Sequence, residues 1–220
     1  MHKNVNNLID VENQLKHIDY RSNNHNTKII AVSKTFPIED IRPLIDYGHQ
    51  HFGENKIQEA MEKWSIIKKD HPNLKLHMLG KLQTNKVKYL LPLFDYLHSL
   101  DSEKLARKIY LEEKKKNKKL KIFIQVNIGN EIQKNGIDIK DVENFYSMCT
   151  KELNLNIIGL MCLPPKSNNP KKFFILLKNI AKKFNLKELS MGMSADYMEA
   201  VECGSTYIRV GSNIFGSRIY

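Results

Sequence analysis

The stretch LSMGMSADYMEAVECGSTYIRVGSNIFGSR, Leu189–Arg218, decides the fold, because its glycines and hydroxyl residues surround two short apolar runs. Ser194, with Asp196 in the following turn, is predicted to be the N-cap of a helix that runs to about Cys203. Gly204 is predicted to stop that helix. The stretch therefore indicates a strand end, a helix and then a second strand.

The second strand is TYIRV, 206–210, and Gly211-Ser212 follows at its end. Backbone N–H groups in turns or at helix N-termini bind anions where the side chains are small enough to let the anion approach. Two anion-binding turns are therefore predicted, one after Leu189-Ser190 and one after Ile208-Arg209. Either turn taken alone could be an ordinary loop, since glycine and serine are common turn residues.

Upstream of this stretch, short apolar runs alternate with helical patterns. The predicted strands are KIIAVS (28–33), HQHFGE (49–54), LKLHMLG (74–80), FDYLHSL (94–100), KIFIQVN (121–127), NIIGLM (156–161), KELSM (187–191) and TYIRV (206–210). Eight strands separated by helices are typical of an α/β protein whose parallel sheet closes into a (β/α)8 TIM-type barrel. A doubly wound open sheet is the alternative, but no G-x-G-x-x-G fingerprint follows the first strand.

Helical periodicity also precedes the first strand. Apolar residues at helical spacing from Leu8 to Ile18 predict an extra N-terminal helix within residues 1–20 that packs on the barrel, followed by the polar linker 20–27. The predicted boundaries of later helices are an N-cap at Asp40 with Pro43 in the first turn, stops at Gly48, His71-Pro72 and Pro92, an N-cap at Asp101, and a start at Pro170.

Composition limits the class of protein. With 220 residues, 41% of them hydrophobic, the chain can bury one substantial core, so a single domain over residues 1–220 is expected. No apolar run could cross a bilayer and the N-terminus lacks an apolar signal core, which favours a cytoplasmic protein without a membrane partner. Cys149, Cys162 and Cys203 show no paired spacing and are expected to be reduced. No histidine or cysteine cluster predicts a metal site.

The net charge of +11 raises the question of nucleic acid binding. The excess is lysine, and its densest runs, KKKNKK at 114–119 and the pairs 171–172 and 182–183, fall where helices are predicted to end or begin. Lysine there is typical of a solvated helix face. No nucleic acid partner is therefore expected.

Active sites of α/β barrels are built at the carboxyl ends of the strands. The residues predicted there are Ser33-Lys34, Gly53-Glu54-Asn55, His77, Gly80, Ser99, Gln125, Asn127, Met161, Ser190, Ser194, Arg209 and Gly211-Ser212. This set suits an aldehyde-bearing phosphorylated cofactor, because the amine can form an imine while the turns hold the phosphate. The alternative is another phosphorylated metabolite, with Lys34 as an electrostatic contact.

The motifs AVSKT, HFGENKIQEA, HMLGKLQTNK, QVNIGNEIQKNGI, GLM and the C-terminal stretch resemble those of the YggS-type pyridoxal phosphate (PLP) homeostasis proteins. The resemblance extends from Ile29 to Arg218, with the motifs in the same order and at similar spacing. It implies a single PLP-binding barrel, related to the N-terminal domain of the alanine racemases and lacking their second, β-rich domain.

The resemblance also implies roles for individual residues. The implied set is Lys34 as the Schiff-base lysine; Ser190, Ser194 and the backbone at Gly211 and Ser212 around the phosphate; Arg209 facing the pyridine nitrogen; and Asn55, His77 and Met161 around the ring. Other readings remain open: Lys34 could be a solvated strand-end lysine, His77 and Met161 core residues, Arg209 a partner of Glu202 or Asp196, and Glu54 and Glu131 surface or supporting groups.

The expected chemistry is weak. An arginine keeps its proton near neutral pH, so the pyridine nitrogen that it faces stays unprotonated and the ring is a poor electron sink. Racemisation also needs an acid or base on each face of the substrate Cα. We therefore expect a PLP carrier with little or no amino-acid turnover. The resemblance further implies a monomer, with PLP-recipient apo-enzymes as partners. The alternative is a PLP-dependent racemase of small-barrel type, with Tyr197 or Tyr207 as the second acid.

Overall fold

Eight parallel strands form a closed barrel in the computed structural model, which describes residues 1–22, 27–131, 133–167 and 169–217. The strands are β1 (Lys28–Val32), β2 (His51–Glu54), β3 (Lys75–Met78), β4 (Tyr96–Leu100), β5 (Lys121–Val126), β6 (Ile157–Cys162), β7 (Glu188–Met193) and β8 (Tyr207–Val210). Each pairs with the next in chain order, and β8 pairs back to β1 with Tyr207 beside Lys28. The predicted barrel is confirmed, and the open-sheet alternative is wrong because each of the eight described strands pairs with a neighbour on both edges.

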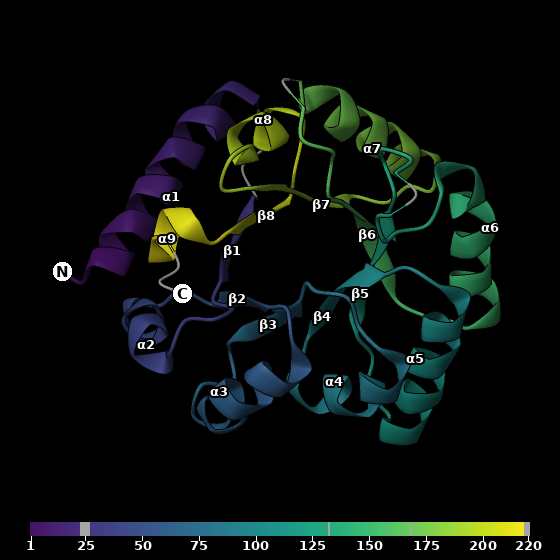
Figure 1. Cartoon of the computed structure of the whole chain (residues 1–220), viewed down its shortest axis with the longest axis horizontal. Coiled ribbons are helices and arrows are strands. Elements are labelled where there is room, and N and C mark those ends of the chain that lie inside the picture. The colour runs from purple at the N-terminus through teal and green to yellow at the C-terminus, as the bar shows by residue number, and fades with distance from the viewer. Residues whose placement is uncertain (23–26, 132, 168, 218–220) are drawn as a thin grey trace.

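Helices surround the barrel as a ring (Figure 1). The α-helices are α1 (Lys3–Ser22), α2 (Ile38–Tyr47), α3 (Ile57–Asp70), α4 (Val87–Leu93), α5 (Glu103–Lys116), α6 (Val142–Ser147), α7 (Lys171–Lys183), α8 (Tyr197–Glu202) and α9 (Ser212–Phe215), with 3-10 turns η1 (Thr84–Lys86) and η2 (Ile139–Asp141) and the π-helical η3 (Met148–Glu152). Within the described ranges, no helix is long and apolar enough to span a lipid bilayer.

The predicted extra N-terminal helix is present as α1, which packs against α9, α8 and α2 (Figure 1). Leu8 is fully buried in that interface. The amide of Asn4 donates to the carbonyl oxygen of Asp40 at 2.9 Å, and the amide of Asn7 donates to that of Ile214 at 2.8 Å. The helix runs two residues further than predicted, to Ser22, and positions 23–26 of the expected linker lie outside the described residues.

Two apolar cores stabilise the barrel. The larger one fills the space between the strands and the ring of helices. The smaller one lies inside the barrel and contains Ile30, Tyr96, Phe123, Met161 and Tyr207. Successive strand residues point to opposite faces, so continuous apolar strands supply both cores.

The predicted start of α2 is wrong. The helix begins at Ile38 after an extended Pro37, so Asp40 lies in its first turn, not at its N-cap. Pro43 is consequently deeper in the helix than the first turn. The predicted stop is confirmed, since Gly48 adopts φ 101°, a left-handed conformation that glycine tolerates.

Two other boundaries differ from the prediction. The N-cap of helix α5 is Ser102, one residue later in the chain than the predicted Asp101. Pro92 lies inside α4 and does not end it; the helix closes when the Phe94 N–H donates to the Leu90 carbonyl oxygen. The stop of α3 at His71 and the start of α7 after Pro170 are confirmed.

Candidate functional site

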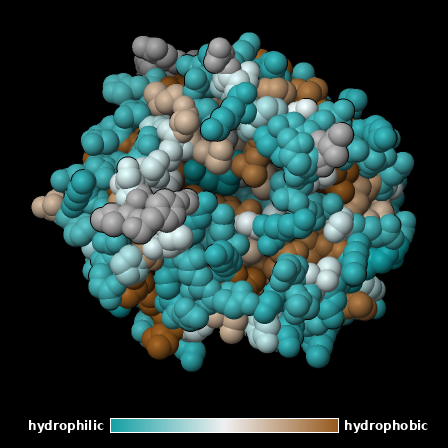
Figure 2. Space-filling model, viewed as in Figure 1, coloured by the Kyte–Doolittle hydropathy of each residue, from teal (hydrophilic) through white to brown (hydrophobic). Residues whose placement is uncertain are grey.

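A cavity of about 630 Å³ opens at the carboxyl ends of the strands. Figure 2 shows the hollow in this face of the molecule, over β7 and β8. Of the predicted site residues, the cavity brings together Lys34, Asn55, Met161, Ser194, Arg209, Gly211 and Ser212. Its volume lies within the usual range of small-molecule sites, roughly 300 to 1,000 Å³.

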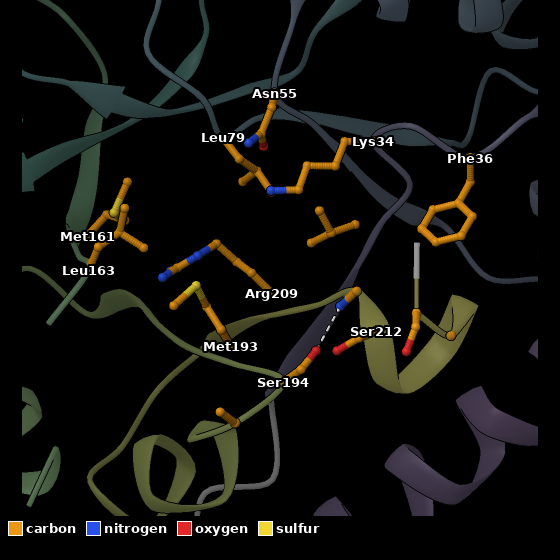
Figure 3. A pocket seen from close by; sticks show the side chains of 15 residues that line it. Lys34, Phe36, Asn55, Leu79, Met161, Leu163, Met193, Ser194, Arg209 and Ser212 are labelled. Carbon is orange, nitrogen blue, oxygen red and sulfur yellow. Dashed lines mark hydrogen bonds between the residues drawn. The ribbon is translucent and has the colours of Figure 1, made fainter. Parts of the chain in front are cut away.

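Lys34 follows β1 and projects into the cavity beneath Asn55 (Figure 3). The next residue, Thr35, has φ 69°, which is unusual for a β-branched residue and must be held by its surroundings. The carboxylate of Glu59 on α3 accepts a hydrogen bond from the Thr35 N–H. The turn that aims Lys34 is therefore fixed from α3.

Lys63, also on α3, holds both sides of the same turn. Its ammonium group donates to the carbonyl oxygens of Ser33 at 2.9 Å and Phe36 at 3.3 Å. It also contacts the carboxylates of Glu54 at 2.7 Å and Glu59 at 2.9 Å. One cation thus ties the helix to the backbone before and after Lys34.

Glu54, at the end of β2, is fully buried and is not the surface group that one reading of the sequence allowed. Its Oε1 accepts hydrogen bonds from the Ser33 hydroxyl at 2.7 Å and from Trp64 Nε1 at 3.0 Å. Its Oε2 has no hydrogen-bond partner among the described residues. Burial raises the pKa of Glu54, although the ammonium group of Lys63 opposes that shift.

The ends of β7 and β8 meet on the opposite side of the cavity from Lys34 (Figure 3). The Gly211 N–H donates to the hydroxyl of Ser194 at 3.1 Å, which joins the two predicted turns. Ser194 is therefore not the N-cap of α8, which begins at Tyr197. The N-cap of α8 is Asp196, and its Oδ1 accepts a hydrogen bond from the preceding Met193 N–H at 2.7 Å.

Gly192 makes this arrangement possible. It has φ +92°, and a Cβ at this position would lie 2.6 Å from the Cβ of Ala200 and 2.9 Å from the Cα of Tyr197. Only glycine both adopts this left-handed backbone conformation readily and has no Cβ to clash with Ala200 and Tyr197. The end of β7 can therefore pass close to α8 before the chain enters the Ser194 turn.

Arg209 extends from β8 into the cavity, with 5% of its surface exposed. One terminal nitrogen donates to the hydroxyl of Ser190 at 2.7 Å and the other to the carbonyl oxygen of Cys162 at 3.0 Å. Neither carboxylate considered from sequence pairs with it, since Glu202 bonds Lys171 at 2.6 Å and Asp196 accepts from backbone. Burial lowers the pKa of Arg209.

Two predicted site residues lie deeper than the cavity. Ser190 is fully buried beneath Arg209, where it contacts His98 and the guanidinium group. His77 is fully buried inside the barrel and stacks on Tyr96 at a centroid distance of 4.1 Å. The structure does not bring either residue to the cavity surface.

The candidate second acids also lie away from the cavity. Tyr207 is the first residue of β8, at the amino-terminal floor of the barrel, where Lys28 lies 4.7 Å from the centre of its ring. Tyr197 directs its hydroxyl to the amide of Gln14 on α1. Burial raises the pKa of both phenols.

Several lining residues were not predicted, and most of them are apolar. They include Phe36, Leu79, Leu163 and Met193. Met193 is the last residue of β7, and the other three follow a strand end by one to four residues, but nothing in the sequence distinguishes such residues from packing residues. Within the described ranges, no group of three or more His, Cys, Asp or Glu side chains could hold a metal ion.

Fold and cavity together define a ligand-binding (β/α)8 barrel whose site lies at the carboxyl ends of the strands. The chain belongs to the family described as "Alanine racemase, N-terminal domain", whose family model matches residues 7–219. This confirms the resemblance found in the sequence. The chain is 36% identical over 202 residues to the "Pyridoxal phosphate homeostasis protein" of Aquifex aeolicus, and the match covers 88% of each chain.

Solved structures agree with this assignment. PipY of Synechococcus elongatus without PLP is 33% identical, with a TM-score of 0.85 over 96% of this chain and 99% of that one. PipY with PLP bound is 34% identical, with a TM-score of 0.79 over 86% and 92% of the two chains. An alanine racemase of Clostridium difficile shares the fold alone, at 15% identity and a TM-score of 0.74 over 99% of this chain and 57% of that one.

Proposed function

We propose that this protein binds PLP as a Schiff base on Lys34 and takes part in intracellular PLP homeostasis, with little or no turnover of amino acids. The supporting observation is that the Lys34 side chain and the bonded Ser194–Gly211 turns face one cavity. PLP supplies an aldehyde that condenses with an amine and a ring that can accept electrons. The Aquifex aeolicus relative is named for PLP homeostasis, and PipY has been solved with PLP bound.

The donor set of the cavity fits PLP. Ser194 and Ser212, with the backbone at Gly211, would hold the phosphate, since small residues at strand ends expose N–H and hydroxyl donors. Arg209 would face the pyridine nitrogen, and Asn55 and Met161 would line the ring. Ser190 and His77, expected from sequence to contact PLP, would act through Arg209.

Low amino-acid turnover follows from the titratable groups available. Among the described residues that line the cavity, only Lys34 and Arg209 carry titratable side chains. Racemisation requires proton transfer on both faces of the substrate Cα, and an arginine is a poor base. Incubation with single L-amino acids in deuterated water should give no Cα exchange above that of free PLP. Exchange well above free PLP would support the racemase alternative.

Reduction with borohydride tests the proposed attachment directly. PLP added to the protein should be fixed by borohydride on one peptide, the one that contains Lys34. Lys34→Ala should abolish both the labelling and the absorbance of bound PLP. Lys81→Ala is the matched control, because Lys81 lies in the loop after β3 and bonds Asn135. A label on any other lysine would rule out the assignment.

The proposal extends to the state of the protein in the cell. Residues 1–220 would act as one PLP-binding domain and as a cytoplasmic monomer that delivers PLP to recipient apo-enzymes. Three unpaired, buried cysteines are consistent with a reducing compartment. Light scattering after size exclusion tests the monomer. Activation of a PLP-dependent apo-enzyme by the loaded protein, faster than by an equal amount of free PLP, tests delivery.

A further inference from the structure

A line of hydrogen-bonded side chains passes through the inside of the barrel and ends at Arg209. His51 Nδ1 lies 2.9 Å from His77 Nε2, and His77 Nδ1 lies 2.9 Å from His98 Nε2. His98 Nδ1 lies 2.8 Å from the hydroxyl of Ser190, which accepts from Arg209 at 2.7 Å. We call His51, His77 and His98 the histidine line.

The histidine line is rigidly enclosed. His51 is the half-buried first residue of β2, at the floor of the barrel, while His77 and His98 are fully buried. His98 stacks on Phe123 at a centroid distance of 4.3 Å, and His77 stacks on Tyr96. Ring rotation would break these stacks and leave buried nitrogens unpaired, which is costly.

Hydrogen bonding restricts the tautomers of the line. Burial lowers the pKa values of all three histidines, to about 4 for His51, so the rings are neutral at pH 7. A neutral imidazole has one N–H donor and one acceptor nitrogen. Each contact between two rings therefore needs a donor on one side only. The two contacts can be satisfied together in two ways: the proton lies on Nε2 in all three rings, or on Nδ1 in all three.

Ser190 distinguishes these two arrangements. The guanidinium group can only donate, so the Ser190 oxygen accepts from Arg209. The Ser190 hydroxyl proton then needs an acceptor, and His98 Nδ1 is its one side-chain candidate among the described residues. His98 must therefore be unprotonated on Nδ1, which places the proton on Nε2 in each ring of the line.

We propose that His98 and His77 are positioning residues for Arg209: the histidine line holds the Ser190 proton away from the guanidinium group and so fixes the group in the cavity. If His98 donated to Ser190, the serine proton would have no acceptor and could point at Arg209. The fixed guanidinium group presents its remaining N–H donors to the cavity. The consequence for PLP rests on the proposed function, whereas the proton order does not.

Nitrogen NMR tests the proton order in protein free of PLP. Long-range 1H–15N correlation spectra of 15N-histidine-labelled protein at pH 7 should show the Nε2–H tautomer for His51, His77 and His98, assigned with single variants. Exchange of the Arg209 side-chain N–H protons should be at least about tenfold faster in Ser190→Ala, since one hydrogen bond to a charged group is lost. The Nδ1–H tautomer at His98, or unchanged Arg209 exchange, would overturn the proposal.

PLP retention tests the consequence for the cofactor. In Ser190→Ala and His98→Phe we expect the dissociation constant of PLP to rise roughly tenfold. His98→Asn, unlike His98→Phe, should bind PLP within about twofold of the wild type, because the asparagine amide oxygen can accept the Ser190 proton. Ser205→Ala is the control, since the Ser205 hydroxyl is also buried and bonds a backbone group, the Met191 carbonyl oxygen, at 2.7 Å.

These experiments distinguish failure of the positioning proposal from failure of the proposed function. Equal losses in Ser190→Ala and Ser205→Ala would mean a purely structural role and would overturn the positioning proposal. If no variant and no wild-type protein binds PLP, the proposed function fails, while the tautomers and the Arg209 exchange rates still decide the role of the histidine line. Circular dichroism of each variant identifies any that does not fold, and Ser190→Ala, the smallest change, then decides.

Discussion

The ammonium group of Lys63 lies 2.9 Å from the carbonyl oxygen of Ser33, the residue before Lys34. The same group lies 2.7 Å from the buried carboxylate of Glu54. A single side chain of α3 therefore neutralises a buried acid and fixes the turn that aims the proposed Schiff-base lysine.

Replacing this cation should affect stability and site together. Lys63→Met leaves Glu54 buried without its partner, and breaking a buried ion pair costs about 3 kcal/mol or more. We expect urea unfolding to show a loss of that order. Under conditions where the variant is folded, borohydride should fix PLP on Lys34 more slowly, because the turn is released.

Lys171→Met is the matched control. Lys171 bonds Glu202 at 2.6 Å, and the side chains of this pair are 48% and 50% exposed. Exposed pairs contribute less than about 1 kcal/mol, so this variant should unfold close to the wild type and label Lys34 at the normal rate. Similar losses in both variants would show that the position of Lys63 beside Glu54 is not what matters.

The buried histidines predict how stability depends on pH. The pKa values of His77 and His98 lie well below 6.5 in the folded protein, mainly through burial. Below 6.5 the unfolded chain therefore binds protons that the native state does not, so the free energy of unfolding falls as the pH falls. The slope should reach up to about 1.4 kcal/mol per pH unit for each histidine.

Urea unfolding at pH 7, 6 and 5 measures this slope. His98→Asn should reduce it, because asparagine does not titrate, and His17→Gln on the exposed face of α1 is the control for the substitution itself. An equal slope in the wild type and His98→Asn would contradict the prediction. The charged or titratable groups near the histidine line, which must be kept unchanged, are Lys28, His49, Lys68, Lys75, Asp95 and Arg209.

The barrel could be predicted from sequence because each strand is a short apolar run bounded by polar residues. Lys34, Asn55 and Ser194 could also be placed, since parallel strands in a barrel end at one face. The direction of side chains within a strand could not be predicted. A strand buried on both faces has no alternation that marks the inward residues, so Ser190 and His77 were expected in the cavity although they lie beneath it.

The support provided by α3 was also beyond the sequence. Lys63 and Glu59 belong to a helix that is amphipathic and charged, where a lysine usually faces solvent. Their role depends on the distance between α3 and the end of β1, which is set by packing around Trp64 and Phe52. The histidine line left one sign in the sequence, which is a polar residue within an otherwise apolar strand, as His98 is in YLHSL.

Two glycines near the Ser194 turn should respond differently to the same change. At Gly192 a methyl group would meet Ala200 and Tyr197 at under 3.0 Å in a left-handed backbone, so Gly192→Ala should lose roughly 1 to 3 kcal/mol of stability. At Gly211 a Cβ would lie 3.6 Å from Val32, an ordinary contact, so Gly211→Ala should fold normally.

PLP binding should separate these variants further. The added methyl group of Gly211→Ala lies beside Val32, which lines the cavity, so it should weaken PLP binding without loss of stability. Urea unfolding and a PLP titration of each variant provide the test. A stable Gly192→Ala, or a Gly211→Ala that binds PLP as tightly as the wild type, would contradict the account of these turns.

The N-terminal helix should influence PLP retention through α9. The amide of Asn7 donates to the carbonyl oxygen of Ile214 at 2.8 Å, and α9 begins with Ser212 at the edge of the cavity. Asn7→Ala should lower the free energy of unfolding by about 1 kcal/mol, the usual value for one hydrogen bond. PLP should also leave faster, because the backbone at Ser212 is less firmly held.

Asn13→Ala, on the exposed face of the same helix, should change neither the free energy of unfolding nor the rate of PLP loss. If the two variants lose PLP at the same rate, α1 contributes to stability alone and α9 is held in place by its own packing.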